Sequence, residues 1–491
     1  MGTISSALSI ISQAINADQA GLNVVANNVA NANTPGYTEE KPAWQENQPI
    51  EINGISVGTG VTETGAVSQR DRVLEERLNQ QQQLSSASGS RLTALQTVQA
   101  LFTPASGSSS STAGDIGSDV TGFFNSFSSL EANPTNNSLR QQVLSSASTL
   151  AGDLSNAAAS LNSQRSALDQ KAAGVASQVN ALASNLAQLN IQIQSTSPHG
   201  DAGTLEDQRQ QDLSQLSQLI GINQTTTDNN GLVVTTTSGQ LLVSNGSSRQ
   251  MTTGTVGGVT HFFVGTTDIT TKLASGGGSL GGDLIARDQD IPAVMNSLDQ
   301  LAYSVSTQVN ALNNSGVDAS GATGAAVSGS KTGVMTLDIF SRPPTQAANQ
   351  ASGGNDVTGS AAAMSVVMTD PGQISSASLG KGTGDNSNAV AMAELGSKTI
   401  VNGETPSNFY SSFVSTLGSS VSNVQNENTA QNASLTQLQT QNDSLSAVNL
   451  NDEAAAMTTL ERSYQAASQV FAMLNTLMAS ALNLGERSTV S

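Results

Sequence analysis

The two ends of this chain carry the same helical pattern, and this repetition constrains the fold more than any other feature. In residues 1–30 apolar side chains recur mainly at steps of three and four, at Ile4, Leu8, Ile11, Ile15, Leu22, Val25 and Val29. The last helical stretch, residues 452–484, repeats this rhythm at Leu460, Tyr464, Ala467, Phe471, Leu474, Met478 and Ala481. Such spacing is typical of coiled coils. We therefore predict two terminal helices with matching apolar seams.

Both ends are also poor in charge. Asp18 is the only charged residue in 1–38, and residues 463–485 contain none. A helix without a charged face is usually surrounded by protein, and an isolated helix is marginally stable. Two interpretations follow from the pattern: the seams form an interface with neighbouring subunits, or the two helices pair in the core of a monomer.

Overall composition excludes several classes of function. Only 11% of the residues are charged, where about 25% is typical, and the net charge of −19 disfavours binding to nucleic acid or anionic lipid. The chain has no cysteine, so it forms no disulfide and no thiolate site. Residues 1–17 lack Lys and Arg and do not match a Sec signal peptide. Four amides interrupt residues 463–485, so we expect no membrane span there.

Composition and periodicity predict a mainly α fold with inserted β structure, in an elongated molecule of several domains. Helical patterns cover 72–102, 120–130, residues from 139 onwards, 161–193, 205–221, 389–395 and 409–445, and a Ser-rich tract at 106–112 is expected to be a loop. Thr- and Val-rich runs with Asn-Gly and Ser-Gly turns indicate a β-domain. The predicted parts are an inner coiled coil (1–38 with 450–485), a helical middle (39–222 with 283–314 and 386–449), an inserted β-domain (223–282) and a second inserted region, irregular or β (315–385).

No motif indicates catalysis, a metal or a cofactor. Gly276, Gly278 and Gly281 match a dinucleotide fingerprint, but no strand precedes them and no βαβ unit follows, so a loop before a helix is favoured. His199 and His261 have no partners for a triad or a zinc site. The pairs Glu75-Glu76 and Asp452-Glu453 are sequence neighbours, which point about 100° apart on a helix. We interpret them as solvated helix faces or dipole partners and expect no enzyme.

A family resemblance begins where the first helix ends. The run Leu22-Asn-Val-Val-Ala-Asn-Asn-Val-Ala-Asn-Ala-Asn-Thr-Pro-Gly-Tyr37 resembles the amino-terminal signature of flagellar rod, hook and hook-associated proteins. Its signature residues are Asn28, Asn31, Asn33, Thr34, Pro35, Gly36 and Tyr37. Pro35-Gly36 fits the centre of a type II turn. The aromatic residues Tyr37 and Trp44 then either anchor the following segment on a neighbouring subunit or pack locally.

Further segments resemble the hook-associated protein 1 family in particular. They are Gly203 to Ile222 with Leu205-Glu-Asp-Gln-Arg209, Gly278-Ser-Leu-Gly-Gly282 followed by Arg287-Asp-Gln, Gly384 to Ala389, and the ending from Val448 to Leu484. The resemblance implies a subunit exported through the flagellar type III apparatus that polymerises as a short ring outside the cell, at the junction of hook and filament. The implied partners are further copies of the chain, the hook protein, a second hook-associated junction protein and a cytosolic chaperone on the carboxyl-terminal helix.

Other functions stay open on the sequence. The chain could be another axial protein of the flagellum, such as a hook or distal rod subunit, or an axial scaffold with an adhesive outer domain. A secreted enzyme would need a catalytic site in 223–282 or 315–385, where we find no suitable cluster. The interior segments that resemble hook-associated proteins favour the junction role.

Overall fold

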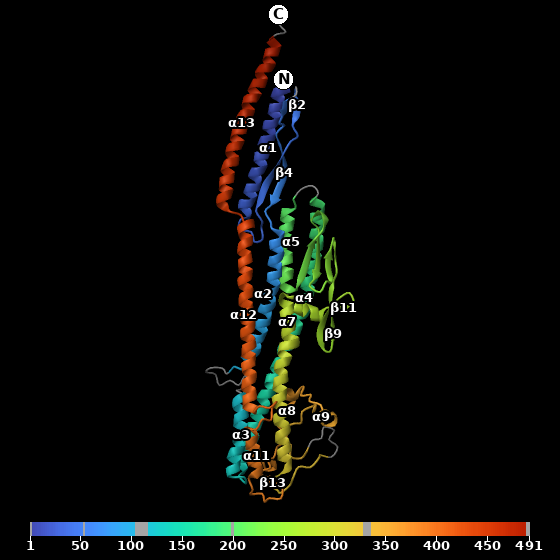
Figure 1. Ribbon diagram of the computed structural model, residues 1–491, viewed down its shortest axis with the longest axis vertical. Helices are drawn as coiled ribbons and strands as arrows, with labels where there is room; N and C mark the ends of the chain where they lie inside the picture. The colour runs from blue at the N-terminus through green and yellow to red at the C-terminus, as the bar shows by residue number, and fades with distance from the viewer. Residues whose placement is uncertain (1, 53–54, 104–115, 198–200, 328–334, 488–491) are drawn as a thin grey trace.

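The computed structural model describes residues 2–52, 55–103, 116–197, 201–327 and 335–487. Figure 1 shows an elongated, largely helical molecule with both chain ends at the same end of the rod. Small antiparallel sheets are inserted between the helices. The predicted mainly α, elongated fold with inserted β structure is therefore confirmed. The Ser-rich tract at 106–112 lies outside the described residues.

The terminal module consists of two antiparallel helices and a β-hairpin. Helix α1 (Gly2–Asn31) lies beside α13 (Leu450–Arg487), as Figure 1 shows at the end that carries the termini. The hairpin pairs β1 (Glu40–Glu46) with β4 (Val61–Ser68), and its tip contains β2 (Ile50–Ile52) and β3 (Ile55–Val57). Both β1 and β4 pack along α1, so residues 40–68 lie with the chain ends and not with the helices that follow.

Long helices form the body of the molecule. They are α2 (Arg72–Ala100), α4 (Asn137–Thr196), α5 (Gly203–Leu219), α7 (Gly278–Ile285), α8 (Ile291–Ser315) and α12 (Pro406–Ser446), with a π-helical turn η2 (Ala286–Asp290) between α7 and α8. Side-chain caps define two of the starts, because Asp71 and Asn136 accept hydrogen bonds from the first turns of α2 and α4. The two helical patterns predicted from the sequence, one from residue 139 onwards and one over 161–193, form a single helix of 60 residues.

The inserted β structure packs against α4. One sheet has the order β5 (Ile222–Thr226), β6 (Leu232–Thr236), β7 (Leu241–Ser244), β8 (Ser247–Ser248), and the other has β9 (Met251–Val256), β10 (Val259–Val264) and β11 (Thr267–Asp268), with a short 3-10 turn η1 (Asp228–Asn230). Val234, Leu242 and Phe262 are fully buried in the same cluster as Val179 and Leu186 of α4. The alternating Thr/Val runs thus form strands, whereas residues 270–276 and 278–282 of the predicted β-domain are helical.

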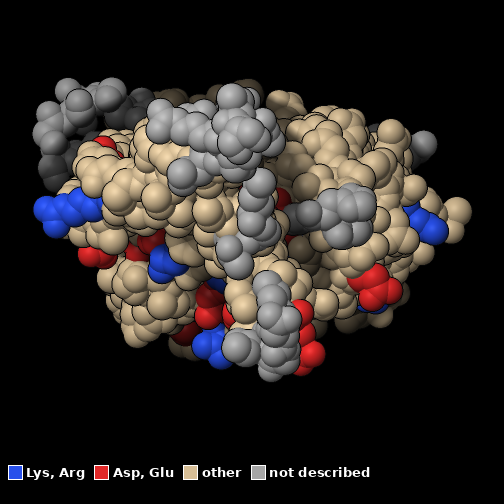
Figure 2. All heavy atoms as spheres, turned by 90° about the horizontal axis from the view of Figure 1, so that it is seen from above, with Lys and Arg blue, Asp and Glu red and all other residues tan. Residues whose placement is uncertain are grey.

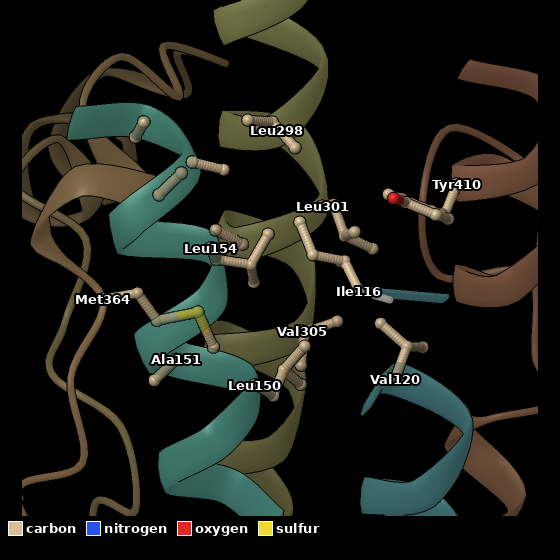
Figure 3. Close-up of a cluster of buried hydrophobic side chains, with 14 of the residues drawn as sticks. Ile116, Val120, Leu150, Ala151, Leu154, Leu298, Leu301, Val305, Met364 and Tyr410 are labelled. Atoms are coloured by element: carbon tan, nitrogen blue, oxygen red, sulfur yellow. The ribbon is translucent and has the colours of Figure 1, made fainter. Parts of the chain in front are cut away.

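The far end of the rod contains the larger hydrophobic core. It combines α3 (Ile116–Ala132), the first half of α4, α8 and α12 with α10 (Ser360–Ala363) and α11 (Ser387–Leu395). Figure 3 shows Leu150 and Leu154 facing Leu301 and Val305, and Ile116, Val120 and Tyr410 belong to the same buried cluster. These apolar contacts join helices that are far apart in sequence.

Most of the described residues between 315 and 385 are irregular, with short elements only. These are β12 (Gly316–Val317), α9 (Gln346–Ser352), α10, η3 (Pro371–Gln373) and β13 (Ala377–Ser378). Two buried asparagines of α8 bond to its backbone: Asn310 Nδ2 donates to the Phe340 carbonyl, at 2.8 Å, and Asn313 Nδ2 to that of Leu337, at 2.7 Å. Helix α8 therefore supplies hydrogen bonds that this segment does not make within itself.

The glycines that match the dinucleotide fingerprint serve close packing of helices. Gly276 ends α6 (Thr270–Gly276), while Gly278 and Gly281 lie in α7. A Cβ atom on Gly278 would lie 2.4 Å from the backbone nitrogen of Ile220, and one on Gly282 would lie 2.1 Å from the carbonyl oxygen of Ala87 in α2. These positions therefore let α7 approach its neighbours at backbone distance.

We predict that Gly282→Ala destabilises the protein by about 1–3 kcal/mol, because the new methyl group has no room against the α2 backbone. The matched control is Gly174→Ala in α4, where a Cβ atom meets nothing within 4 Å. This change should be neutral or stabilise by ~0.5–1 kcal/mol, since alanine has the higher helix propensity. Urea unfolding followed by circular dichroism measures both. Equal midpoints for the two variants would contradict the packing argument.

Candidate assembly site at the chain ends

Gly21 has no side chain, and the space that it leaves on α1 is filled by side chains from two other segments. A Cβ atom on Gly21 would lie 3.1 Å from Cδ1 of Leu460 in α13 and 3.3 Å from Cζ2 of Trp44 in β1. The Trp44 Nε1 also donates to the Ala17 carbonyl oxygen, at 3.4 Å. Trp44 thus packs on its own chain, although 45% of it stays exposed.

Asn28 joins the separate parts of the terminal module through hydrogen bonds. Its side chain is 1% exposed. Its Oδ1 accepts from the Tyr37 hydroxyl at 2.8 Å and from the Glu40 backbone N–H at 3.1 Å. Its Nδ2 donates to the Glu40 carbonyl and to Glu453 Oε1, both at 2.8 Å. One amide therefore uses both donors and two acceptor sites to connect α1, the turn after it, β1 and α13.

The remaining signature residues build the turn that delivers Tyr37 to Asn28. Gly36 has φ 81°, and the Tyr37 N–H donates to the Thr34 carbonyl at 3.2 Å, as the predicted type II turn requires. Asn31 Nδ2 caps the end of α1 by donating to the Asn27 carbonyl at 3.0 Å, and the Thr34 hydroxyl donates to Asn31 Oδ1 at 3.2 Å. Asn33, Thr34, Pro35 and Gly36 are themselves exposed.

Burial raises the pKa values of three ionisable groups around Asn28, a contact region that we call the Asn28 joint. Burial, followed by the negative charges of Glu40, Asp207 and Glu453, raises the pKa of Tyr37 to about 12. Burial also raises the pKa of Glu453, although the hydrogen bond from Asn28 works in the opposite direction. The pKa of Glu40 is raised by burial and then by the nearby carboxylates of Asp201 and Asp207. The folded joint therefore favours the protonated form of each of these groups.

An ionic cluster, which we call the ionic elbow, joins the terminal module to the body. It contains Arg70, Arg72, Glu75, Glu206 and Asp207. Asp207 of α5 accepts from the Thr38 N–H at 3.1 Å and the Thr38 hydroxyl at 2.7 Å, and pairs with Arg70 at 2.6 Å. Glu206, whose side chain is 1% exposed, pairs with Arg70 at 3.3 Å and Arg72 at 3.2 Å. The segment Leu205–Arg209 thus holds the base of the hairpin.

The structure corrects the interpretation of two acidic residues as solvated. Glu75 is largely buried and pairs with Arg70 at 3.2 Å, and burial is the largest cause of its raised pKa. Glu453 is 5% exposed and bonds to Asn28. Glu75 pairs with Arg70 in the loop before α2, and Glu453 bonds to Asn28 near the other end of the sequence. Their sequence neighbours Glu76 and Asp452 therefore gave no indication of these contacts.

The two apolar seams face each other within one chain but are only partly covered. Val25 is buried and Val29 is exposed, while Ile4, Leu8, Ile11, Ile15 and Leu22 are half-buried. On α13, Tyr464 is exposed, and Leu460, Ala467, Phe471, Leu474, Met478 and Ala481 are half-buried. Helix α13 also exposes Val470, Met473 and Leu477 on one flank of its seam, and Leu482 near its end. Pairing of the helices therefore leaves an open apolar surface along α13.

Within the described ranges, no helix is long and apolar enough to cross a membrane. No three acidic or histidine side chains gather as a metal site in that part of the chain. His261 Nδ1 lies 2.7 Å from Asp268 Oδ2 between two strands, and His199 is outside the described residues.

Comparisons with known proteins find similarity to flagellar proteins. Residues 106–327 match the helical domain of flagellar hook-associated protein FlgK, and residues 8–38 match the flagella basal body rod protein family. Flagellar hook-associated protein 1 of Salmonella typhimurium is 26% identical over 550 residues, covering 96% of this chain and 98% of the relative. The Bacillus subtilis relative of the same name is 24% identical over 512 residues, covering 96% of each chain.

A solved structure supports the fold. It is the flagellar hook junction protein FlgK from Burkholderia pseudomallei, with a TM-score of 0.60 and 19% sequence identity. The match covers 74% of this chain and 99% of that one. At this identity the likeness bears on the fold alone.

We predict that Asn28→Ala loosens the terminal module by about 1–3 kcal/mol, because it leaves Glu453, Tyr37 and the Glu40 backbone without their buried partner. Trp44, the single tryptophan, lies in this module, so its fluorescence during urea unfolding reports the change. Asn23→Ala on the exposed side of α1 is the control and should leave the midpoint unchanged. An Asn28→Ala midpoint equal to that of the control would refute the role of Asn28.

We also predict that the joint weakens as pH rises. The folded-state pKa of Glu453 lies above its ordinary value of 4.5, so its stabilising contribution is present below that pH and is lost as pH rises through the folded value. Glu453→Gln keeps an acceptor for Asn28 without the buried charge, so it should flatten the dependence measured by Trp44 fluorescence between pH 4 and pH 7. Glu461→Gln, exposed on the same helix, should behave as wild type. Parallel pH curves for both variants would contradict this cause.

Proposed function

Because this chain belongs to the flagellar hook-associated protein 1 family, we propose that it is a structural subunit that joins the hook to the filament of the bacterial flagellum. The observation that carries the mechanism is the open apolar side of α13, displayed on paired terminal helices. Met473 and Leu477 are 57% and 58% exposed, so they contribute little apolar burial to the stability of the monomer. Burying the exposed part of each side chain against neighbouring subunits would contribute about 1–2 kcal/mol.

In this proposal the terminal seams form the inner wall of a short ring, and the inserted β structure faces outward. The interface comprises the seam residues of α1 and α13 together with the exposed side of α13. The division into an inner coiled coil, a helical middle and two outer insertions is part of the same proposal. Its role is structural, without a catalytic site.

The proposal extends to partners and location. The ring would contact the hook protein on one side and a second hook-associated junction protein on the other, outside the cell. The subunit would reach this place through the flagellar type III apparatus, with a cytosolic chaperone covering α13 before export. The apolar stripe Val470, Met473 and Leu477 supports the chaperone, because such a surface is prone to aggregation until it is covered.

Deletion of the gene in the native bacterium tests the role directly. We expect cells that keep hooks, lose attached filaments and do not swim, with filaments restored by the wild-type chain. Electron microscopy of the cell surface is the measurement. Attached filaments of normal number on the deletion strain would exclude the junction role.

Substitutions on α13 test the mechanism. Met473→Glu combined with Leu477→Glu should leave the thermal unfolding of the body unchanged, because both side chains are exposed, yet fail to restore filaments. The control, Gln465→Glu with Asn475→Glu, adds the same charge at two exposed amides of α13 and should restore them. Full restoration by Met473→Glu/Leu477→Glu would show that this surface is not an interface.

A further inference from the structure

A groove lined mainly by uncharged polar residues runs along the body next to the terminal module. Two adjoining cavities, of about 430 and 320 Å³, share Pro35, Gly36, Asp207 and Gln211. Helix α5 forms one wall, the end of α12 the other, and Leu78, Asn79 and Gln82 of α2 the floor. We call this the elbow groove. Asp207, its only charged lining residue, is held by Arg70 and Thr38, so the groove offers an essentially uncharged surface.

The α5 wall displays a regular stripe of polar side chains. Thr204, Gln208, Gln211, Gln215 and Gln218 line the groove at steps of four, three, four and three, and all are exposed. Among the hydrogen bonds of the described residues, none uses the side chain of Gln211, Gln215 or Gln218. This spacing is that of a helix–helix seam, so the stripe suits a partner helix with uncharged polar side chains.

The opposite wall contains an unsatisfied polar atom. Leu435, Gln439 and Asn442 of α12 line this side of the groove. The Oδ1 of Asn442 is buried and has no hydrogen-bond partner within the described part of the chain. A buried acceptor left unpaired costs about 1–3 kcal/mol, so a donor that enters the groove would recover this loss.

The chain already joins two of its own helices through side chains of this kind. Between α2 and α12, Gln81 Nε2 donates to Gln431 Oε1 at 2.6 Å. The Ser85 hydroxyl donates to Asn432 Oδ1 at 2.6 Å, and Asn428 Nδ2 to the Ser88 hydroxyl at 3.0 Å. Uncharged amide and hydroxyl groups therefore serve as helix-packing groups in this protein.

We propose that the elbow groove receives the outer face of α12 from a second copy of this chain, an inference that rests on the proposed polymerisation. The outer face consists of Asn426, Thr429, Ala433, Gln437 and Thr440, which are exposed and uncharged. This face lies nearly opposite the residues of α12 that line the groove. Gln437, for example, is two positions from both Leu435 and Gln439, and residues two apart on a helix point about 200° apart. The amides of the outer face supply donors for Asn442 Oδ1 and partners for the Gln stripe.

Two physical arguments favour a second copy as the occupant. Groove and outer face lie on different sides of one subunit, so their contact is heterologous and repeats around a ring or helix. The chain has a net charge of −19, and like-charged surfaces repel, whereas these two surfaces carry almost no charge. Figure 2, which views the molecule from above, shows how much of the visible surface is uncharged.

Cross-linking tests the contact, since the chain has no cysteine of its own. Gln215→Cys and Gln437→Cys chains are expressed together in the deletion strain, and hooks are isolated and oxidised. We expect disulfide-linked dimers from the mixture and none from either variant alone. The pair Gln178→Cys with Gln437→Cys, which places the first thiol on an exposed turn of α4, should give a severalfold lower yield. Equal yields for both pairs on assembled hooks would overturn the proposal.

A charge-matched series separates this inference from the proposed function. Gln211→Glu, Gln215→Glu and Gln218→Glu together should leave the monomer folded but reduce the number of subunits on isolated hooks severalfold. Gln178→Glu, Gln188→Glu and Gln192→Glu, exposed on α4, add the same charge and should bind as wild type. If the groove variant assembles normally while wild type is present on hooks, the groove is excluded. If wild type is absent from hooks, the proposed function itself fails.

Discussion

The terminal module depends on the buried hydrogen bonds of Asn28. The seams of α1 and α13 are only half-covered within one chain, and Trp44 of the hairpin packs at Gly21 of α1 but stays 45% exposed. Neither contact alone fixes how the three segments meet. Asn28 does so because its four partners come from α1's own turn, from the backbone of β1 and from α13. Asn28 thereby fixes the register between residues 425 positions apart.

The chain has few charged residues and places several of them at the joints between its parts. The ionic elbow joins the hairpin to α5. At the π-helical turn, Arg287 pairs with Asp169 of α4 at 2.6 Å, and Arg91 of α2 pairs with Asp290 at 2.8 Å. Amide groups, by contrast, connect α2 to α12, and apolar seams connect the chain ends. The contacts at these joints therefore combine ion pairs, amide hydrogen bonds and apolar packing, with ion pairs concentrated at the elbow and at the π-helical turn.

Sequence patterns predicted the helices well because each helix reports its buried face through local spacing. The hairpin at 40–68 was missed, since Pro42 and the charged residues around it lower the β propensity of β1. The irregular region 315–385 gave no pattern, because Asn310 and Asn313 on α8 hold its backbone from outside. In the candidate site, the signature turn was predictable from Pro35-Gly36, whereas the partners of Asn28 and Glu75 required the tertiary structure.

The difference in burial between the body and the ends follows from what an assembling subunit requires. Leu150, Leu154 and Val305 are fully buried, so the body has a core of its own. The terminal seams bury less, and α13 displays further apolar side chains. Helices of this kind gain stability mainly from packing neighbours. The body can therefore fold as a monomer, and in the proposed assembly the ends would gain further stability against other subunits. The hydrogen bonds of Asn28 suit that proposed order, because they hold the two ends in register within a single chain.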